Sequence, residues 1–559
     1  MSEFIEKTLG AWMDEMAERL HDHEALVYVD RGIRLTYSQL NDVARQAAKS
    51  LLALGVKKGT HVAIWANNYP EWIYLLLATA KIGAVLVTVN TNYKLFELEY
   101  LLRQSDTHTM MFMKSLKDVD YVAICNELLP EIAENGSSIG FQTERLPELH
   151  NLVYLPHDAG EDIPENYTSW QAFMEMGRDI PDSELEAIEK TLDCHDVINM
   201  QYTSGTTGFP KGVMLTHHNI INNGKCIGDN MKMTPVDRLL ITVPFFHCFG
   251  LVLSIMNCLT HGSTMVPIDV YSPTKVMAAI EKERCTALNG VPTMFIFMLE
   301  HKDFSKYDFS SLRTGIMAGS PCPITVMNQA IELMNMKQIT ICYGLTEASP
   351  VMTQTSVDDS VEHRVSTVGR CMPNLELKVV DPDTGLEVPD GVNGEICVRG
   401  YSVMKGYYKM PEATAAAIDK DGWLHSGDLV VRNPDGYYKI TGRIKDMIIR
   451  GGENIYPREL EELLYTHPAI SDVQVIGVPS KQFGEEVMAC IILKEGETAT
   501  EDEIKEFMRK NVARHKVASY VQFVDSFPMN AAGKIQKYKL REMAVELLKL
   551  HDAENIETA

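Results

Sequence analysis

Short apolar runs and longer amphipathic stretches alternate in the first part of the chain. Apolar runs cover residues 61–65, 84–89 and 109–113, and between them lie helix-period stretches that begin at Pro70 and Leu95. Apolar runs of this length that alternate with helical stretches are typical of parallel strands joined by crossover helices. The pattern therefore predicts an α/β fold of layered sheets covered by helices.

The pattern changes twice farther along the chain. Residues 121–179 are rich in turn residues and predict a surface insertion, whereas residues 368–439 contain short β-type runs between turn signals, which predict a small β-barrel or a meander. After about Ile444, helical and strand-like stretches alternate again. We therefore predict a large N-terminal domain over residues 1–444 and a smaller α+β C-terminal domain over residues 445–559.

The charge of the chain narrows the classes of partner. Lys and Arg number 52 against 76 Asp and Glu, which gives a formal net charge of −24 over 559 residues. Such a surface repels nucleic-acid phosphates and anionic membranes, so a phosphate-bearing ligand needs a local site. The longest apolar stretch, residues 72–89, is interrupted by Lys81 and Gly83, so we expect no integral membrane association.

The termini and the cysteines favour a cytoplasmic enzyme. Acidic residues such as Glu3 and Glu6 exclude an ordinary secretory signal, and residues 556–559 form no retention or peroxisomal address. The eleven cysteines are odd in number and include no C-x-x-C pair, so their spacing signals neither a disulfide framework nor a zinc site. The sequence leaves the oligomeric state open.

The densest run of Gly, Ser and Thr in the chain follows a predicted strand over residues 197–202. Its members are Thr203, Ser204, Gly205, Thr206, Thr207 and Gly208, with Lys211 close behind. Glycines let backbone N–H groups approach an anion, hydroxyls add donors and a lysine adds charge, which together make a phosphate cradle. The alternative is a polar, flexible hairpin turn. The run is not a Walker A loop, because G-x-x-x-x-G-K-[ST] does not occur.

Two later segments of the chain offer side chains suited to the base, the ribose and the Mg²⁺ ion of a magnesium-bound nucleotide. In the run from Tyr343 to Glu347, the aromatic ring can stack on adenine, the Thr346 hydroxyl can contact the α-phosphate, and the Glu347 carboxylate can hold Mg²⁺. Asp428 offers two acceptor oxygens to the two ribose hydroxyls. Taken singly, the plain alternatives are a strand end with a solvated glutamate and a common Gly-Asp turn.

These motifs recur in one order along nearly the whole chain. T-S-G-T-T-G-x-P-K-G at Thr203 is followed by Tyr343 to Glu347, Ser426 to Asp428, Thr441 to Asp446, Gly451 to Ile455, and Pro528 to Ile535. The sequence resembles the adenylate-forming superfamily of acyl-CoA synthetases, firefly luciferases and peptide-synthetase adenylation domains. The resemblance implies an AMP-forming acyl-CoA ligase that uses ATP, Mg²⁺ and CoA, with acyl-AMP as the intermediate.

The resemblance also implies roles for further residues. It places Gly319, Ser320 and Pro321 in the adenine pocket, Tyr343, Gly344 and Arg443 at the nucleotide, Thr206 and Glu347 at the metal, and Lys534 as the catalytic lysine of adenylation only. It makes Lys445 the hinge of a rotating C-terminal domain, with Gly451, Gly452 and Glu453 along the CoA tunnel. Arg450 and Lys516 are basic residues that either meet the CoA phosphates or are ordinary surface charges.

The acid to be activated is predicted from the segment that begins at His247. The resemblance places this segment at the acyl pocket, with candidate lining residues His247, Phe249, Gly250, Met294 and Gly344. His247 is a candidate catalytic base, a satisfied core histidine or a gate. Residues 247–267 contain no Asp or Glu, which argues against an amino-acid substrate. Medium-chain fatty acids are the first expectation, and aryl or alicyclic acids the second.

Two other classes of function remain at this stage. A luciferase-like oxygenase would react the same adenylate with O₂, but no local motif marks an oxygenation site. A non-catalytic nucleotide- or acyl-binding protein would require loss of the catalytic groups. Lys211, Glu347, Asp428, Arg443 and Lys534 are all present, so we expect an active ligase.

Overall fold

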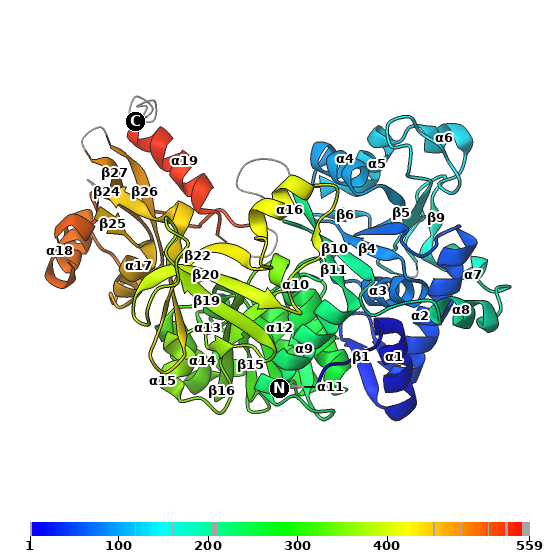
Figure 1. The fold of residues 1–559 in the computed structure, drawn as a ribbon, viewed down its shortest axis with the longest axis horizontal. Coiled ribbons are helices and arrows are strands. Elements are labelled where there is room, and N and C mark those ends of the chain that lie inside the picture. Colours follow the sequence, from blue (N-terminus) through cyan, green and yellow to red (C-terminus); the bar gives the residue numbers. More distant parts are fainter. Residues whose placement is uncertain are drawn as a thin grey trace.

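The computed structural model describes residues 3–117, 119–158, 160–203, 210–320, 322–450, 453–480, 483–512, 514–530 and 535–550. The elements of residues 61–113 lie where the apolar periodicity predicts them. They are β3 (His61–Trp65), α3 (Pro70–Ile82), β4 (Val85–Thr88), α4 (Leu95–Gln104) and β5 (Thr107–Phe112). Two large mixed sheets and the helices that accompany them make up the larger part of the structure. The orange and red C-terminal elements form a lobe at one side (Figure 1).

One sheet has the strand order β21-β11-β10-β4-β3-β5-β8-β9. Its other strands are β8 (Asn151–Tyr154), β9 (Thr168–Ser169), β10 (Val197–Thr203), β11 (Lys211–Thr216) and β21 (Gly406–Tyr407). The expectation that residues 121–179 form a surface insertion is wrong. β8 is buried along its whole length and pairs in parallel with β5, so this region extends the sheet. The pattern does not predict β8 because this strand has only four residues and turn residues are frequent on either side of it.

The second sheet has the order β18-β17-β16-β15-β14-β12-β13-β1-β2. Its strands are β1 (Glu24–Tyr28), β2 (Ile33–Thr36), β12 (Arg238–Ile241), β13 (Thr264–Pro267), β14 (Ala287–Gly290), β15 (Thr314–Met317), β16 (Gln338–Gly344), β17 (Val351–Gln354) and β18 (Arg370–Cys371). The strands from β1 to β16 in this order are parallel neighbours. Their carboxyl ends therefore meet at one edge, which is where open α/β sheets bind ligands.

Helix α9 (His217–Met231) packs between the two sheets. It contacts β11 of one sheet and both β16 and β17 of the other, and nearly all of its residues are buried. Two glycines let the next helical segment approach closely. A Cβ atom on Gly224 would lie 2.5 Å from Met256 Cβ, and one on Gly228 would lie 2.3 Å from His261 Cε1. Contacts shorter than 3 Å cannot form, so this packing requires glycine at both positions.

The remaining helices before residue 420 cover the outer faces of the sheets or join strands. They are α1 (Leu9–Arg19), α2 (Tyr37–Ala53), α5 (Tyr121–Leu128), α6 (Glu131–Asn135), α7 (Trp170–Met176), α8 (Asp182–Glu189), α10 (Cys248–Gly250), α11 (Asn257–His261), α12 (Pro273–Glu283), α13 (Pro292–Leu299), α14 (Ile324–Leu333), α15 (Val361–Ser366) and α16 (Pro411–Ala417). Within the described residues, no helix is both long and apolar enough to cross a membrane.

The β-rich segment after residue 368 forms a small antiparallel sheet. Its order, β19-β20-β22-β23, follows the chain, with β19 (Leu375–Val380), β20 (Asn393–Gly400), β22 (Leu424–Arg432) and β23 (Tyr438–Arg443). Among the described strands no pairing joins β23 back to β19. The strand order is that of a meander, and backbone hydrogen bonds of 2.8 and 2.9 Å between Tyr438 and residues 368–369 bring β23 back to the segment that precedes β18.

The C-terminal lobe has its own sheet and its own core. The strands are β24 (Ile448–Arg450), β25 (Glu453–Ile455), β26 (Ile470–Ser480), β27 (Gly484–Leu493) and β28 (Tyr520–Phe523), with helices α17 (Pro457–Tyr465), α18 (Glu501–Asn511) and α19 (Lys537–Leu548). Apolar residues of α17 and α18 cover one face of the sheet, and those of α19 cover the other. These clusters are separate from the cores of the two large sheets, so the lobe is a separate α+β domain.

Lys81 is fully buried in α3, and its ammonium group connects α3 to α1 through an ion pair with Asp14. Its Nζ lies 2.7 Å from Asp14 Oδ1 and 3.4 Å from Glu189 Oε1. In Lys81→Met the two carboxylates lose this buried counter-charge, although Arg45 remains 3.9 Å from Asp14. We expect the free energy of unfolding to fall by about 2 kcal/mol, measured by urea unfolding.

The matched control is Lys7→Met, which removes an exposed ion pair between Lys7 and Glu15 at the same helix. Exposed pairs contribute little, so this variant should change the free energy of unfolding by less than about 1 kcal/mol. Equal losses in the two variants would contradict a structural role for the buried ammonium.

Candidate active site

The predicted motifs converge at the edge where parallel strands of both sheets end. β10 ends at Thr203 in one sheet, and β16 ends at Gly344 in the other. Gly319 follows the end of β15, and Met294 follows the end of β14. Strand order within each sheet and the packing of the two sheets therefore bring these residues, which lie far apart in the sequence, to the same side of the large domain.

Asp428 is held between two other residues predicted for the nucleotide site. Tyr343 donates its hydroxyl to Asp428 Oδ2 at 2.8 Å, and Arg443 Nε lies 2.7 Å from Asp428 Oδ1. Asp428 on β22 and Arg443 on β23 are direct partners in the antiparallel ladder, so strand register creates this ion pair. Asp428 is only 5% exposed, whereas the Arg443 side chain is 39% exposed, so the carboxylate of the pair is shielded from water and the guanidinium is in part accessible.

Both partners of Asp428 keep their protons at neutral pH. Burial and the neighbouring carboxylate of Asp428 raise the pKa of Tyr343 well above its ordinary value, so its hydroxyl stays a donor. Burial opposes the charge on Arg443, but the carboxylates of Asp428 and Asp446 outweigh it and raise the pKa of the guanidinium. A carboxylate has about four lone-pair sites, so Asp428 retains acceptor capacity for hydroxyl groups.

Glu347 is oriented by Tyr407, a residue that the sequence analysis missed. The Tyr407 hydroxyl donates to Glu347 Oε1 at 2.8 Å, and Lys211 Nζ lies 4.4 Å from the centroid of the Tyr407 ring. Tyr407 reaches this position because β21 pairs with β11, with Val213 opposite Tyr407. No motif marks this tyrosine, since the contact exists only once the two strands have paired.

The contact between Glu347 and Tyr407 suits a cation site. Burial and the Glu347 carboxylate raise the pKa of Tyr407, so its hydroxyl stays protonated and remains a hydrogen-bond donor to Glu347. The hydrogen bond occupies one of several lone-pair sites on the carboxylate. The remaining oxygens are the hard ligands that Mg²⁺ prefers, so this donor is chemically suited to that ion.

Thr346 begins the 3₁₀ turn η3 (Thr346–Ala348), which also carries Glu347. Burial and the Glu347 carboxylate raise the pKa of the Cys248 thiol, next to His247, so this thiol is no nucleophile at neutral pH. His247 Nδ1 accepts the backbone N–H of Phe249 at 3.1 Å and caps α10. Nδ1 is thus engaged as an acceptor, which places the proton of the neutral imidazole on Nε2.

Close backbone packing joins the predicted adenine loop to the predicted acyl segment. Gly319 has a φ of +88°, and a Cβ atom there would lie 3.1 Å from Val291 Cγ1 and 3.8 Å from Phe249 Cδ1. A Cβ atom on Gly250 would lie 2.2 Å from Pro244 O, so both positions require glycine. The buried π-helical turn η1 (Leu251–Met256) follows directly, a conformation frequently found at functional sites.

Met294 and Gly344 are fixed by contacts with neighbouring backbone. Met294 is 9% exposed, and its carbonyl accepts the Tyr271 hydroxyl at 2.7 Å. A Cβ atom on Gly344 would lie 1.8 Å from Pro350 O, so no other residue fits between β16 and the following turn. The need for glycine at 344 is therefore structural, whatever ligand lies beside it.

The basic residues predicted for CoA are paired with carboxylates. Arg450 makes a two-point contact with Glu486, at 2.6 and 3.1 Å, and Lys516 Nζ lies 2.6 Å from Glu459 Oε2. A phosphate would have to compete with these partners. Arg458 of α17 instead donates to the carbonyl of Cys322 at 2.9 Å, next to the predicted adenine loop, and so docks the C-terminal domain there.

Several of the predicted positions lie outside the described residues. They are Ser204, Gly205, Thr206, Thr207, Gly208, Pro321, Gly451, Gly452 and Lys534. The side chains of Lys445 and Glu453 are also outside the described part of the chain, although their backbones belong to a 3₁₀ turn, η4 (Ile444–Asp446), and to β25. The roles assigned to all these residues stay predictions.

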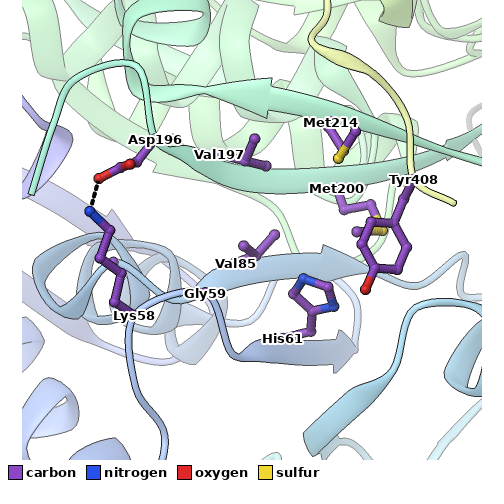
Figure 2. Close-up of a pocket in the computed structure, with 10 residues that line it drawn as sticks. Lys58, Gly59, His61, Val85, Asp196, Val197, Met200, Met214 and Tyr408 are labelled. Carbon is purple, nitrogen blue, oxygen red and sulfur yellow. Dashed lines mark ion pairs between the residues drawn. The ribbon is translucent and has the colours of Figure 1, made fainter. Parts of the chain in front are cut away.

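A cavity of about 220 Å³ lies away from the motif residues, at the amino ends of β3, β4 and β10 (Figure 2). Met200, Met214 and Val85 make its apolar wall, and the ion pair between Lys58 and Asp196 lies at one side. Because strands in this part of the sheet are parallel, this is the edge opposite to the one where the motifs gather. The cavity is therefore not part of the candidate active site.

Comparison with known proteins places this geometry in a family. The family model described as AMP-binding enzyme matches residues 13–408, and the model described as AMP-binding enzyme C-terminal domain matches residues 459–534. The chain is 53% identical over 554 residues to the Bacillus subtilis (strain 168) protein named "Putative acyl-CoA synthetase YngI", covering 99% of this chain and 100% of that protein.

Two further relatives agree. The human mitochondrial medium-chain acyl-CoA ligase ACSF2 is 40% identical over 551 residues, covering 97% of this chain and 88% of that protein. The crystal structure of the anthranilate CoA ligase AuaEII in complex with anthranoyl-AMP has a TM-score of 0.84 at 26% identity, covering 98% of this chain and 99% of that one. The chain therefore belongs to the AMP-binding enzyme family, within the adenylate-forming superfamily, and is by class an AMP-forming acid–thiol ligase.

Proposed function

We propose that this enzyme converts an apolar carboxylic acid, in the first place a medium-chain fatty acid, into its CoA thioester through an acyl-AMP. The observation that carries the proposal is the buried apolar segment after His247. Residues 247–267 contain no Asp or Glu, and Phe249 and the η1 turn are buried beside Gly319. A substrate ammonium would find no counter-charge in this segment, whereas an alkyl chain would lose contact with water.

The chemistry needs activation because a carboxylate is a poor electrophile. A carboxylate oxygen attacks the α-phosphorus of ATP and pyrophosphate leaves; the CoA thiolate then attacks the acyl carbon and AMP leaves. Asp428, held by Tyr343 and Arg443, would accept the ribose hydroxyls, and Lys211 with residues 203–208 would hold phosphates. Mg²⁺ bound by Glu347 and Thr206 would neutralise phosphate charge, and Lys534 would contact the reacting oxygens.

An aryl acid is the second candidate. The structural neighbour AuaEII is an anthranilate CoA ligase, and its overall similarity to this chain supports a pocket that accepts a ring. The relatives named as medium-chain acyl-CoA ligases are more similar in sequence, at 40 to 42% identity, and so favour the alkyl chain. The two candidates differ in the shape of the acid and share the same two half-reactions.

The two half-reactions require different groups at one carbon atom. We propose that the C-terminal domain turns about Lys445, so that Lys534 serves adenylation and residues 451–455 serve thioester formation. A separate core allows the domain to move as a body. The contacts that would have to break include the bond from Arg458 to Cys322 O and a 2.8 Å bond from Ser471 to Glu300 Oε1.

The test of function is pyrophosphate release with ATP and Mg²⁺ across acids from acetate to palmitate, with benzoate and cyclohexanecarboxylate, with and without CoA. We expect the highest kcat/KM with medium-chain acids and sustained turnover only when CoA is present. A preference for benzoate would favour the aryl candidate. Turnover that does not depend on CoA would contradict the thioester step.

Tyr407→Phe tests how Glu347 is oriented. Loss of a hydrogen bond to a half-buried carboxylate costs about 1.4 kcal/mol, or tenfold, so we expect the apparent KM for Mg²⁺ in pyrophosphate release to rise about tenfold. Excess Mg²⁺ should restore part of the rate. Tyr408→Phe is the matched control, since the Tyr408 hydroxyl bonds to Asp106 instead; if both variants behave alike, the proposed role of Tyr407 is wrong.

Lys445→Pro tests the hinge, because proline fixes φ near −65°. We expect this variant to keep one half-reaction and lose the other, measured separately as acyl-AMP formation from acid and ATP, and as acyl-CoA formation from synthetic acyl-AMP. Lys445→Ala leaves the backbone free and should retain both. Unimpaired overall turnover in the proline variant would rule out rotation at this residue.

A further inference from the structure

Three side chains that are candidate metal ligands lie close together, with His218 as a fourth candidate beside them, far from the motif residues. Donor atoms of Glu6, Cys194 and His195 all lie within 4.8 Å of one another. The Cys194 thiol lies 3.7 Å from Glu6 Oε2, and His218 Nε2 lies 3.3 Å from Glu6 Oε1. The rings of His195 and His218 are 4.8 Å apart, centroid to centroid. One carboxylate, one thiol and one imidazole therefore lie close enough together to share an ion, and the His218 imidazole lies beside the carboxylate.

Backbone hydrogen bonds hold the three contributing segments in place. Ile5 N donates to Asn222 Oδ1 at 2.7 Å and Asn222 Nδ2 donates back to Ile5 O at 3.2 Å, which fixes the residue before Glu6. His218 N donates to Cys194 O at 2.8 Å, so these two ligands are joined directly through the backbone.

The turn that carries the other two ligands is closed by its own side chains. Asp193 N donates to Asp196 Oδ2 at 2.8 Å, and His195 N donates to Asp193 Oδ1 at 2.8 Å. The cluster is therefore assembled by contacts that do not involve the ligand atoms themselves. Such support lowers the cost of organising a metal site.

We propose that Glu6, Cys194, His195 and His218 bind one Zn²⁺ ion. Sulfur, imidazole nitrogen and carboxylate oxygen are the donors that zinc takes in four-coordinate structural sites. A thiolate and a carboxylate together balance the two charges of the ion. Metal–ligand distances of about 2.0–2.3 Å require donors roughly 3.3–3.8 Å apart in a tetrahedron. The donors of Glu6, Cys194 and His195 lie within 4.8 Å of one another, so these side chains and that of His218 would have to close around the ion.

The surroundings allow an ion to enter and give it a structural role. A cavity of about 290 Å³, lined by His195 and His218 among others, opens beside the cluster. The bound ion would join the N-terminal segment to the loop before β10 and to the first turn of α9, positions separated by 188 and 212 residues from Glu6. Binding to the folded chain alone would stabilise it.

A second group of similar composition does not carry the same inference. Glu395, Cys397 and His425 also cluster, but His425 Nδ1 is 2.9 Å from Glu395 Oε2, and Glu395 Oε1 accepts the Gly427 N–H at 2.8 Å. Unlike Glu6 and His195, Glu395 and Cys397 are buried. The hydrogen bond to Gly427 accounts for this group as support for the turn before Asp428.

The experiment adds Co²⁺ and Zn²⁺ separately to the full chain after removal of metal by a chelator. We expect one ion per chain, a thiolate-to-Co²⁺ charge-transfer band with the intense visible bands of tetrahedral Co²⁺, and a Zn²⁺-dependent rise in the midpoint of thermal unfolding. Absence of the charge-transfer band, or a midpoint that Zn²⁺ leaves unchanged, would overturn the proposal.

Ligand variants and control variants distinguish Zn²⁺ binding at this site from nonspecific binding elsewhere on the chain. Glu6→Gln, Cys194→Ser and His195→Ala each remove one ligand, and we expect each to weaken Zn²⁺ binding in chelator competition by at least roughly 10- to 100-fold. Glu6 and His195 are exposed, so the chain should still fold without these ligands. Cys371→Ser and His21→Ala, which alter another free cysteine and an exposed histidine, should bind as the parent does. Equal affinity in the ligand and control variants would also overturn the proposal.

Discussion

Parallel pairing is the constraint on which the rest of the structure depends. In each large sheet the parallel strands run the same way, so every loop that follows a strand opens at the same edge. Helix α9 packs between the sheets and sets their separation, with glycines where the next helical segment comes closest. Lys211 at the start of β11 and Glu347 after β16 both contact Tyr407 in this arrangement, although they lie far apart in the sequence.

At that edge, polar groups are paired before any ligand arrives. Asp428 is held by Tyr343 and Arg443, and Glu347 is held by Tyr407. Burial of Asp428 would be costly without partners, and pairing leaves each carboxylate oriented. A nucleotide that adds further donors to Asp428, or a cation that binds Glu347, meets groups that need little rearrangement. The described geometry therefore favours binding through preorganisation.

The C-terminal domain is physically independent in a way that the proposed mechanism requires. Both faces of its sheet are covered by its own helices, so its stability does not depend on the large sheets. Its contacts with the rest of the chain include single hydrogen bonds, such as that from Arg458 to Cys322 O. A domain with its own core can move without unfolding, and this is the property that the proposed pair of half-reactions at one carbon requires.

The sequence by itself determined the α/β class, the elements of residues 61–113, the family and the positions of most candidate ligands, because periodicity and motifs record local burial and local chemistry. It did not indicate that β8 extends a sheet, that Tyr407 orients Glu347, or that Asp428 and Arg443 form a pair. Cysteine spacing likewise signals no zinc site, since Glu6, Cys194 and His218 come from three separate segments. Only the tertiary structure decided these contacts, because strand order and register bring together residues whose separation along the chain carries no local signal.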